Sequence, residues 1–503
     1  MDCSLGKFPG RTEGGFVLVA VMALITVLLA TGAAFMRWST DESLQSAEAA
    51  AAMQAYYLGQ MGIVERGFMW LRTLPASDLP LGETIIPGKQ VPGFGSYSNV
   101  TIRYLPWYQE GDFWAIQRRF RISSVGTVRI PVYHNGRDDY KDVKRLAVLY
   151  VEVRNFVDYM YLSDDELTSR GERIKFWHGD TLQGRVHSNS QIAIMQDPVF
   201  YELVTSTECD FWLQGGAHPV FLGPDPIFRA ARVEIPQLAE RLRQGAAQQG
   251  NFFDYASQTV RAVVQGRTIL FYRWPTGTPF DSSSSWSLSI TDGACIFVNG
   301  PLELKGTVTG RLTIGSAGTL RLLDDIRYTD ADPRTGVIPP ALLDESQNVL
   351  GIVSESEVKV ANTPQNGREN SAGLGQAQTN PNLTDIVITA AIVALGESFT
   401  FENQNDPDSG YVFEGSPDDR GTIYLFGSVT QMRRGYVHRR NNTSTGYLKK
   451  YVYDRRLQRR RPPCFFDVTD EHGHALFNVV QWGQGISPPS SLPERESKSV
   501  RYN

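Results

Sequence analysis

The chain has 503 residues, of which 41% are hydrophobic and 20% charged, and its formal net charge is −5 at pH 7. This length exceeds what a single hydrophobic core usually serves, so it predicts two or more domains. The mildly acidic balance argues against nucleic acid as the main partner, because phosphate binding usually shows as a basic face.

An uninterrupted apolar run occupies residues 16–36, with no charged side chain and no proline. About 20 apolar residues in a helix suffice to cross a hydrocarbon core of roughly 30 Å. Lys7 and Arg11 precede the run, and Arg37 alone follows it closely. The positive-inside rule therefore predicts a single pass through the inner membrane, with a cytoplasmic N-terminus and everything after the run exported.

A Gly-Gly-Phe sequence stands at the start of this run. Gly15 and Phe16 lie on its cytoplasmic side, after a short polar leader that carries Lys7 and Arg11. The arrangement resembles the class III leader of type IV pilins and type II secretion pseudopilins. The resemblance implies that prepilin peptidase cuts between Gly15 and Phe16 and removes residues 1–15. An ordinary N-terminal anchor with a chance Gly-Gly-Phe is the alternative.

Helical character is expected to continue past the membrane, so that residues 16–74 form one transmembrane and stem helix. No proline interrupts them, residues 42–57 are rich in strong helix formers, and Pro75 supplies a stop. Residues 55–67 resemble the end of the stem in minor pilins of the PilX and GspK types.

In a pilin filament such helices would pack on one another through apolar faces and small residues. Here the packing residues are expected to be Phe16, Leu18, Ala20, Leu24, Leu28 and Gly32. Major pilins carry a glutamate at the fifth mature position, which is Ala20 in this chain. The sequence therefore departs from the major-pilin pattern and resembles the tip-type pseudopilin.

The rest of the chain is predicted to be β-rich, which gives an α+β fold class. In residues 75–176, a Pro- and Gly-rich linker precedes short, alternating β-branched segments, which predict an antiparallel meander. Residues 177–430 contain short strands interrupted by Gly, Asn and Asp, and these predict a β-solenoid-like head. A β-sandwich or jelly roll is the alternative. Residues 431–503 are expected to form a basic β segment and tail.

One helix is expected inside the head, at residues 234–248. Leu238, Leu242 and Ala246 fall four residues apart, and Pro236 lies in the first turn, where proline is tolerated. We expect this helix to pack against or cap the β region.

Three cysteines, Cys209, Cys295 and Cys464, remain after the leader is removed together with Cys3. None belongs to a Cys-x-x-Cys pair, which argues against a zinc ribbon or a thioredoxin-like site. One disulfide outside the cytoplasm and three isolated thiols both remain open, and the sequence does not choose a pair.

Several segments resemble an uncharacterised family of pilin-like surface proteins labelled DUF4900. They are residues 159–166, 184–189, 197–200 and 453–457, with Pro462-Pro463. The resemblance extends over most of residues 150–483. It implies exported β domains of the kind described above, and no activity.

Catalytic and metal sites find little support. His187, Ser188 and Asn189 are adjacent, but a triad requires spatial neighbours, and neighbouring strand residues point to opposite faces. A polysaccharide lyase or glycosidase working in a solenoid groove would need converging carboxylates or bridging calcium. The acidic candidates stand beside turn residues, which favours a turn role; they are Asp324, Asp325, Asp330, Asp332, Asp406, Asp408, Asp418 and Asp419. A further group matches no standard metal spacing: Asp467, Asp470, Glu471, His472 and His474.

A basic cluster near the C-terminus is the remaining candidate site. It consists of Arg455, Arg456, Arg459, Arg460 and Arg461. It could bind an anionic glycan or DNA, with Tyr447, Tyr451 and Tyr453 as a stacking surface. The alternative is a solvated strand edge protected by its charge.

These observations together predict a large minor pilin or pseudopilin. Its helix joins other pilins in a filament, and its β-rich head is displayed at or near the tip for assembly initiation or adhesion. We expect no enzymatic activity and no cofactor. The expected partners are the inner membrane, other pilins, prepilin peptidase and a surface, glycan or protein ligand. A membrane-tethered carbohydrate-active enzyme and a single-pass envelope adhesin are the alternatives.

Overall fold

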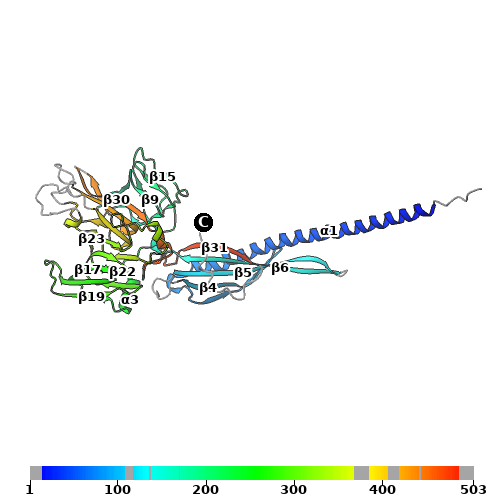
Figure 1. Cartoon of the computed structure of the whole chain (residues 1–503), viewed down its shortest axis with the longest axis horizontal. Helices are drawn as coiled ribbons and strands as arrows, with labels where there is room; N and C mark the ends of the chain where they lie inside the picture. The colour runs from blue at the N-terminus through cyan, green and yellow to red at the C-terminus, as the bar shows by residue number, and fades with distance from the viewer. Residues whose placement is uncertain are drawn as a thin grey trace, which may run out of the picture.

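The computed structural model describes residues 14–107, 117–134, 137–168, 170–366, 385–405, 418–440 and 443–485. The molecule is elongated, with a long helix projecting from a β-rich body (Figure 1). The helix comprises α1 (Gly14–Gly62), a π-helical segment η1 (Ile63–Phe68) and α2 (Met69–Arg72). The predicted long N-terminal helix is therefore confirmed, and it ends two residues before Leu74. The predicted leader lies almost entirely outside the described residues.

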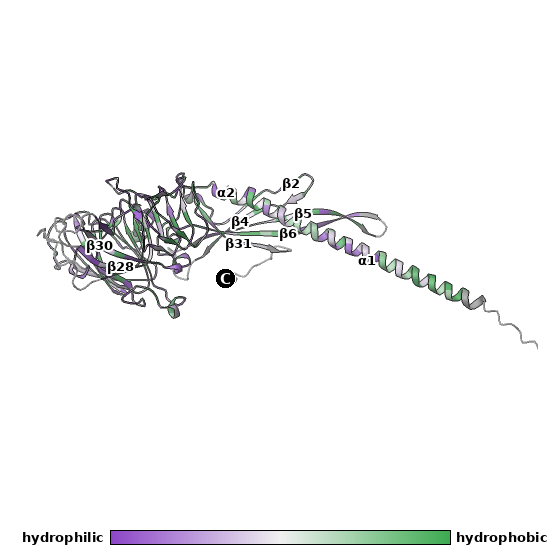
Figure 2. Cartoon of the chain, turned by 90° about the horizontal axis from the view of Figure 1, so that it is seen from above, coloured by the Kyte–Doolittle hydropathy of each residue, from purple (hydrophilic) through white to green (hydrophobic). Residues whose placement is uncertain are grey.

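The two halves of the long helix have different surroundings. Residues 18–47 are all exposed, and the free end is strongly hydrophobic (Figure 2). Further along, Ala51, Ala55 and Leu58 are buried against a β-sheet. A Cβ atom on Gly126 of this sheet would lie 1.8 Å from the Ala55 carbonyl oxygen. Glycine at this position therefore allows the sheet to approach the helix backbone.

The sheet that packs on the helix is antiparallel. Its order is β1-β4-β5-β3-β2, and β6 joins it by pairing with both β5 and β31. The strands are β1 (Glu83–Ile86), β2 (Lys89–Val91), β3 (Gly95–Tyr97), β4 (Val100–Trp107), β5 (Gln117–His134), β6 (Arg137–Val153) and β31 (Phe477–Gly485). We call the long helix and this sheet the stalk.

The stalk sheet differs in two ways from the meander expected over residues 75–176. First, its sixth strand, β6, ends at Val153, and the next strands of that range pair with later parts of the chain. Second, β31 comes from residues 431–503, which were expected to form a separate basic β segment and tail, and it returns to pair with β6. Both differences depend on long-range pairing, which local alternation of residue types does not encode.

Beyond the stalk, the first strands of the head pair in parallel in three sets, of which two are separate three-stranded sheets and the third belongs to the large sheet of the head. β10 pairs with β7 and β13, β11 with β8 and β14, and β12 with β9 and β15. The register is regular, because Val186 faces Tyr161 on one side and Val204 on the other. The strands are β7 (Tyr161–Asp165), β8 (Lys175–Phe176), β9 (Thr181–Leu182), β10 (Val186–Ser188), β11 (Ala193–Ile194), β12 (Val199–Phe200), β13 (Val204–Ser206), β14 (Trp212–Leu213) and β15 (Val220–Phe221).

The second part of the head also pairs alternate strands in parallel. β20, β22, β24, β26 and β28 form one succession, and β28 pairs in turn with β7 and β30. The strands are β16 (Phe252–Phe253), β17 (Gln258–Gly266), β18 (Thr268–Pro275), β19 (Ser285–Ser289), β20 (Ala294–Val298), β21 (Leu302–Val308), β22 (Arg311–Ser316), β23 (Leu320–Tyr328), β24 (Val349–Ser354), β25 (Val358–Val360), β26 (Ile386–Ala394), β27 (Phe399–Phe401), β28 (Asp418–Arg433), β29 (His438–Arg440) and β30 (Ser444–Tyr453).

Short 3-10 helices connect several of these elements. They are η2 (Ala76–Asp78), η3 (Phe156–Asp158), η4 (Pro340–Leu342), η5 (Pro364–Asn366) and η6 (Arg455–Gln458). The head's main core is made of Val, Ile, Leu and aromatic side chains from the stacked strands. A large β-rich region after the long helix is thus confirmed.

The helix expected over residues 234–248 is shorter than predicted. It is α3 (Glu240–Gln248), because Glu234 instead forms a bridge with Thr469. Leu242 and Ala246 are buried as expected, whereas Leu238 precedes the helix and is 48% exposed. The spacing of four residues therefore predicted burial correctly for Leu242 and Ala246, which lie in the helix, but not for Leu238, which precedes it.

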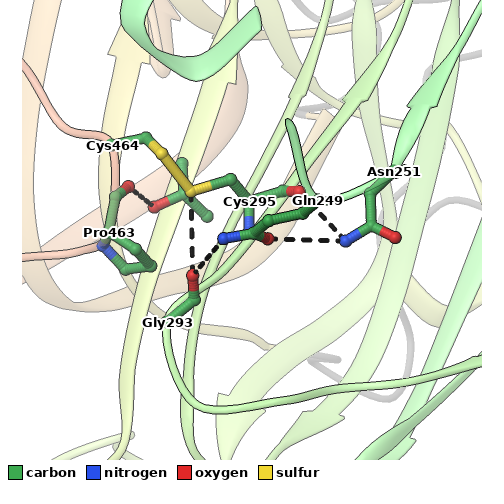
Figure 3. Close-up of a disulfide and its surroundings, with 7 residues drawn as sticks. Gln249, Asn251, Gly293, Cys295, Pro463 and Cys464 are labelled. Atoms are coloured by element: carbon green, nitrogen blue, oxygen red, sulfur yellow. Dashed lines mark hydrogen bonds between the residues drawn. A yellow bond between two sulfur atoms is a disulfide. The ribbon is translucent and has the colours of Figure 1, made fainter. Parts of the chain in front are cut away.

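A disulfide joins the head to the returning C-terminal segment. Cys295 of β20 bonds to Cys464, which lies between η6 and β31 (Figure 3). The side chain of Gln249, just after α3, accepts a hydrogen bond from the Cys295 N–H at 2.7 Å, and Thr313 donates to the Pro463 carbonyl at 2.5 Å. Cys209 is exposed and free. The pairing that the sequence left open is therefore Cys295 with Cys464.

Candidate functional site

The first candidate site is the exposed half of α1. Among the described residues, one helix, Leu18–Arg72, is long and apolar enough to cross a membrane. The expected packing residues Leu18, Ala20, Leu24, Leu28 and Gly32 are all exposed. Gly15 and Phe16 lie in the first turns of α1, and the side chain of Phe16 lies outside the described residues. This half is consistent with single-pass anchoring.

A second candidate site is a cleft of about 540 Å³ in the head. It lies where the turn between β8 and β9 faces the segment from β28 to β30. Six cationic side chains line it, against one acidic side chain, Asp180. The cations are Arg173, Lys175, Arg434, Arg439, Arg440 and Lys449. We call this hollow the cationic cleft.

Three of the six cations are neutralised by acids. The Lys449 ammonium lies 2.6 Å from Asp180, Arg434 lies 2.7 Å from Glu166, and Arg439 lies 3.5 Å from Glu172. Burial lowers the pKa of Lys449 below its usual value, although Asp180 opposes this shift. These pairs hold the walls of the cleft together, because each joins segments that are far apart in the sequence.

The other three cations have no acidic partner among the described residues. Arg173 and Lys175 lie 5.3 and 5.6 Å from the Trp212 ring centre, within the range of cation–π contacts. Arg440 is exposed. The cleft therefore carries an excess of positive charge that no acidic side chain among the described residues compensates.

Aromatic side chains complete the cleft. The rings of Trp177 and His438 are stacked, with centres 6.1 Å apart and planes 16° apart. Burial lowers the pKa of His438, which favours the neutral ring. The Tyr451 hydroxyl is buried and has no hydrogen-bond partner among the described residues, and burial raises its pKa. The cleft thus offers cations, a flat ring surface and one unsatisfied hydroxyl.

The predicted arginine cluster does not form one surface. Arg456 and Arg461 are buried, and their guanidinium groups lie 2.7 Å from Asp454 and 2.6 Å from Glu152. Arg460 donates to the Asp344 carbonyl at 2.6 Å, while Arg455 and Arg459 are exposed. The five arginines therefore do not share one surface on which an anionic ligand could bind, because neighbouring arginines around η6 have different partners.

The tyrosines expected beside that cluster are not a stacking surface either. Tyr447 and Tyr453 are buried, and their hydroxyls donate at 2.6 Å to the carbonyls of Asn366 and Val157. Tyr451 instead lines the cationic cleft. Tyr447, Tyr451 and Tyr453 lie on the same face of β30, because every second side chain of a strand points to the same side. This face is the one turned toward the interior of the head.

His187 and its neighbours form a buried structural network. The ring nitrogens lie 2.7 Å from Thr205 Oγ1 and 2.9 Å from Asn189 Oδ1. Ser188 Oγ accepts a hydrogen bond from Ser163 at 3.1 Å. Burial lowers the pKa of His187 to about 4, so the ring is neutral near pH 7. These contacts support the expectation that the trio is structural.

The acidic residues considered as catalytic or calcium-binding candidates have separate partners. Asp325 accepts from the Val387 N–H, Asp332 from the Arg334 N–H, and Asp419 from the Ser444 hydroxyl. Asp418 is fully buried beside Arg420. Asp324 accepts from the Asp325 N–H at 2.8 Å. Asp406 and Asp408 lie outside the described residues.

The metal candidates at residues 467–474 are also occupied by protein partners. Asp467 pairs with Arg118 and Arg241, at 2.8 and 3.0 Å. Asp470 accepts from the backbone N–H groups of His472 and His474. Within the described part of the chain, no cluster of three or more His, Cys, Asp or Glu side chains could hold a metal ion.

The comparisons with known proteins cover a limited part of the chain. A family model described as a domain of unknown function, DUF4900, matches residues 133–209. This range runs from the end of β5 through β13, and so it includes one wall of the cationic cleft. The matched range is shorter than the resemblance expected over residues 150–483. No curated protein and no solved structure matches the chain.

The cationic cleft was not predicted from the sequence. Most of its residues come from two segments, 173–182 and 429–451, separated by roughly half of the chain. A local signal existed in Arg173, Lys175 and Trp177, which stand two residues apart in the sequence. That signal does not indicate a site by itself, since the opposite wall is supplied only by the pairing of β28 with β7.

Proposed function

We propose that this protein is a large minor pilin or pseudopilin-like subunit of a type IV filament system. It is anchored in the inner membrane before assembly and displays its head at or near the filament tip, for assembly initiation or adhesion. The observation that supports this proposal is a single helix with two environments. Residues 18–47 are exposed, whereas one face of the following turns packs against an antiparallel sheet.

The physical argument starts from the exposed apolar side chains of α1. Leu24, Leu28 and Leu29 are 60–69% exposed, and a helix with such a surface needs lipid or other apolar helices around it. Lipid meets that need before assembly, and neighbouring stem helices meet it in a filament. The sheet and head then remain outside the membrane, attached to the last turns of the same helix.

A tip position follows from two features. Ala20 replaces the glutamate that would pair with a neighbouring N-terminal amine in a packed shaft. An unpaired charge in lipid costs a few kcal/mol, so losing the glutamate is tolerated where no such partner exists. The head is also broad compared with the stalk (Figure 1), which would crowd a helically packed shaft.

We also propose that the head is a β-solenoid. The parallel pairing of alternate strands supports this, since a coil that returns above itself places each strand on its counterpart in the next coil. β20, β22, β24 and β26 follow this rule. A β-sandwich or jelly roll would instead be built from antiparallel neighbours.

N-terminal sequencing of the mature protein tests the filament proposal. In cells with prepilin peptidase we expect the chain to begin at Phe16. Gly15→Leu should abolish the cut, whereas Gly14→Ala should leave it intact as a matched control. A mature chain that begins at Met1, or within the head, would refute the pilin assignment and favour a simple envelope adhesin.

The tip position has its own test. Ala20→Glu should leave membrane insertion largely intact but change where the protein lies in filaments, as seen by immunogold labelling of the head. Ala23→Ser, a neutral change in the same helix, is the control. Unchanged tip labelling in Ala20→Glu would count against the argument from the missing glutamate.

A further inference from the structure

We propose that the cationic cleft of the head binds an acidic glycan, through a sugar that carries a carboxylate. This inference gives the adhesive role under Proposed function a ligand class and rests on it for biological meaning. The binding itself requires neither cleavage nor filament assembly, so it can be tested separately.

The charge of the cleft indicates an anionic ligand. Arg173, Lys175 and Arg440 lack acidic partners among the described residues, and Asp180, the acidic side chain of the lining, is already paired with Lys449. Arginine is well suited to a carboxylate because its planar guanidinium presents two parallel N–H donors. The whole chain is acidic at −5, so this concentration of positive charge is a local feature.

The rings of the cleft indicate a ligand with a flat apolar face. Trp177 is half-buried and stacked on His438, so its position is fixed before any ligand binds. A pyranose ring has such a face, formed by its C–H groups, together with hydroxyls at its edge. An aromatic platform beside cations therefore matches a sugar acid better than it matches a bare inorganic anion.

The Tyr451 hydroxyl is the second, independent sign of a ligand. It is buried in the lining of the cleft without a hydrogen-bond partner among the described residues, and buried polar groups are normally hydrogen-bonded. A ligand hydroxyl that reaches the floor of the cleft would satisfy it. This requirement again favours a polyhydroxylated ligand.

A nucleic acid is the competing polyanion, and the shape of the site argues against it. Single strands usually bind along an extended basic groove with several stacking rings. Here the cations converge on one hollow of about 540 Å³, a volume typical of small-ligand sites. The arginines that could have extended the charge, Arg456 and Arg461, are buried in ion pairs.

Binding to defined oligosaccharides tests the proposal. The full-length chain in detergent is titrated by calorimetry with oligogalacturonate and with sialyllactose, and in parallel with methyl-esterified oligogalacturonate and lactose. We expect at least one acidic probe to bind and its neutral counterpart to bind at least tenfold more weakly. Failure of both acidic probes, or equal binding of the neutral counterparts, overturns the proposal. Tighter binding of a single-stranded oligodeoxynucleotide also overturns it.

Variants locate the binding in the cleft. Arg440→Met and Trp177→Ala should each weaken binding of the acidic probe about tenfold, whereas Arg129→Met, at an exposed arginine of the stalk, should not change it. Tyr451→Phe should weaken binding severalfold without lowering thermal stability, because the removed hydroxyl has no partner. Unaltered binding in all three cleft variants would refute this site. If the protein binds the acidic glycan but is not cut after Gly15 in cells with prepilin peptidase, the glycan-binding proposal stands and the pilin proposal is refuted.

Discussion

The stalk and the head are both rich in β-structure, but they obtain it in opposite ways. In the stalk, β5 and β6 are consecutive strands that form one long antiparallel hairpin. The helix beside them is a single uninterrupted segment, α1. In the head, parallel pairs join strands from separate turns of the chain, as when β28 pairs with β7 across more than 250 residues. Apart from β31, the stalk therefore depends mainly on pairing between neighbouring segments, whereas the head depends on pairing between segments far apart in the chain.

The C-terminal segment ties the two regions together. It bonds to the head through Cys464, pairs Asp467 with Arg118 of the stalk, and ends as a strand of the stalk sheet. Damage to this segment should therefore disturb both regions, whereas damage within the stalk sheet should remain local. The following predictions test that difference, in order of decreasing effect.

The largest effect is expected at the ion pair between head and stalk. Arg461 is 3% exposed and reaches Glu152 of β6 at 2.6 Å. Arg461→Met should destabilise the chain by about 3–5 kcal/mol, because the buried carboxylates of Glu152 and Asp158 lose compensating charge, although Arg119 still pairs with Glu152 at 2.7 Å. Denaturant unfolding of the full-length protein in detergent measures this. Arg129→Met removes the exposed pair with Asp142 and should cause no measurable change. Equal effects in both variants would contradict the junction role.

The disulfide should rank next. Cys295 and Cys464 are 169 residues apart, so their bond restricts a large part of the unfolded chain. Cys464→Ser should lower stability by about 2–4 kcal/mol. Cys209→Ser, at an exposed free thiol, is the matched control and should behave like the unaltered protein. If a reductant lowers the unfolding midpoint of the Cys464→Ser variant as much as that of the unaltered protein, the disulfide is not the cause.

Acid should weaken the head through His187. Its pKa is lowered from about 6.5 to about 4 by burial, so the unfolded chain binds more protons between these values. Stability contributed by the neutral ring is complete above pH 6.5 and is lost as pH falls toward 4, by at most about 3 kcal/mol. His187→Gln should remove this part of the pH dependence, and His178→Gln, at an exposed site, should retain it. Identical pH profiles in the two variants would contradict this account.

The smallest effect should stay inside the stalk. Gly126→Ala places a Cβ atom against the Ala55 carbonyl and should cost about 1–3 kcal/mol through a forced separation of helix and sheet. Limited proteolysis should show faster cutting of the stalk with an unchanged head. Gly82→Ala is the control, because a Cβ there meets nothing within 4 Å. Faster cutting of the head as well would mean that the two regions are more tightly coupled than their contacts indicate.

Much of the stalk could be predicted from the sequence, and little of the candidate site could. The apolar run and the absence of proline before Pro75 define the helix, and alternation with turn residues defines strands such as β4 and β5. These signals are local, and so is the structure they specify. The run of arginines near the C-terminus does not reveal that Arg456 and Arg461 are buried, nor that each forms an ion pair with a different carboxylate.

The sequence by itself determined a long apolar helix, an α+β chain and a succession of short strands after it. The physical reason is that helix propensity and hydrophobic periodicity act over a few residues. The tertiary structure alone decided that Cys295 bonds to Cys464, that β31 completes the stalk sheet, and that Trp177 and Arg440 line one cleft. Each of these depends on segments far apart in the chain, whose meeting is set by register and packing rather than by any local pattern.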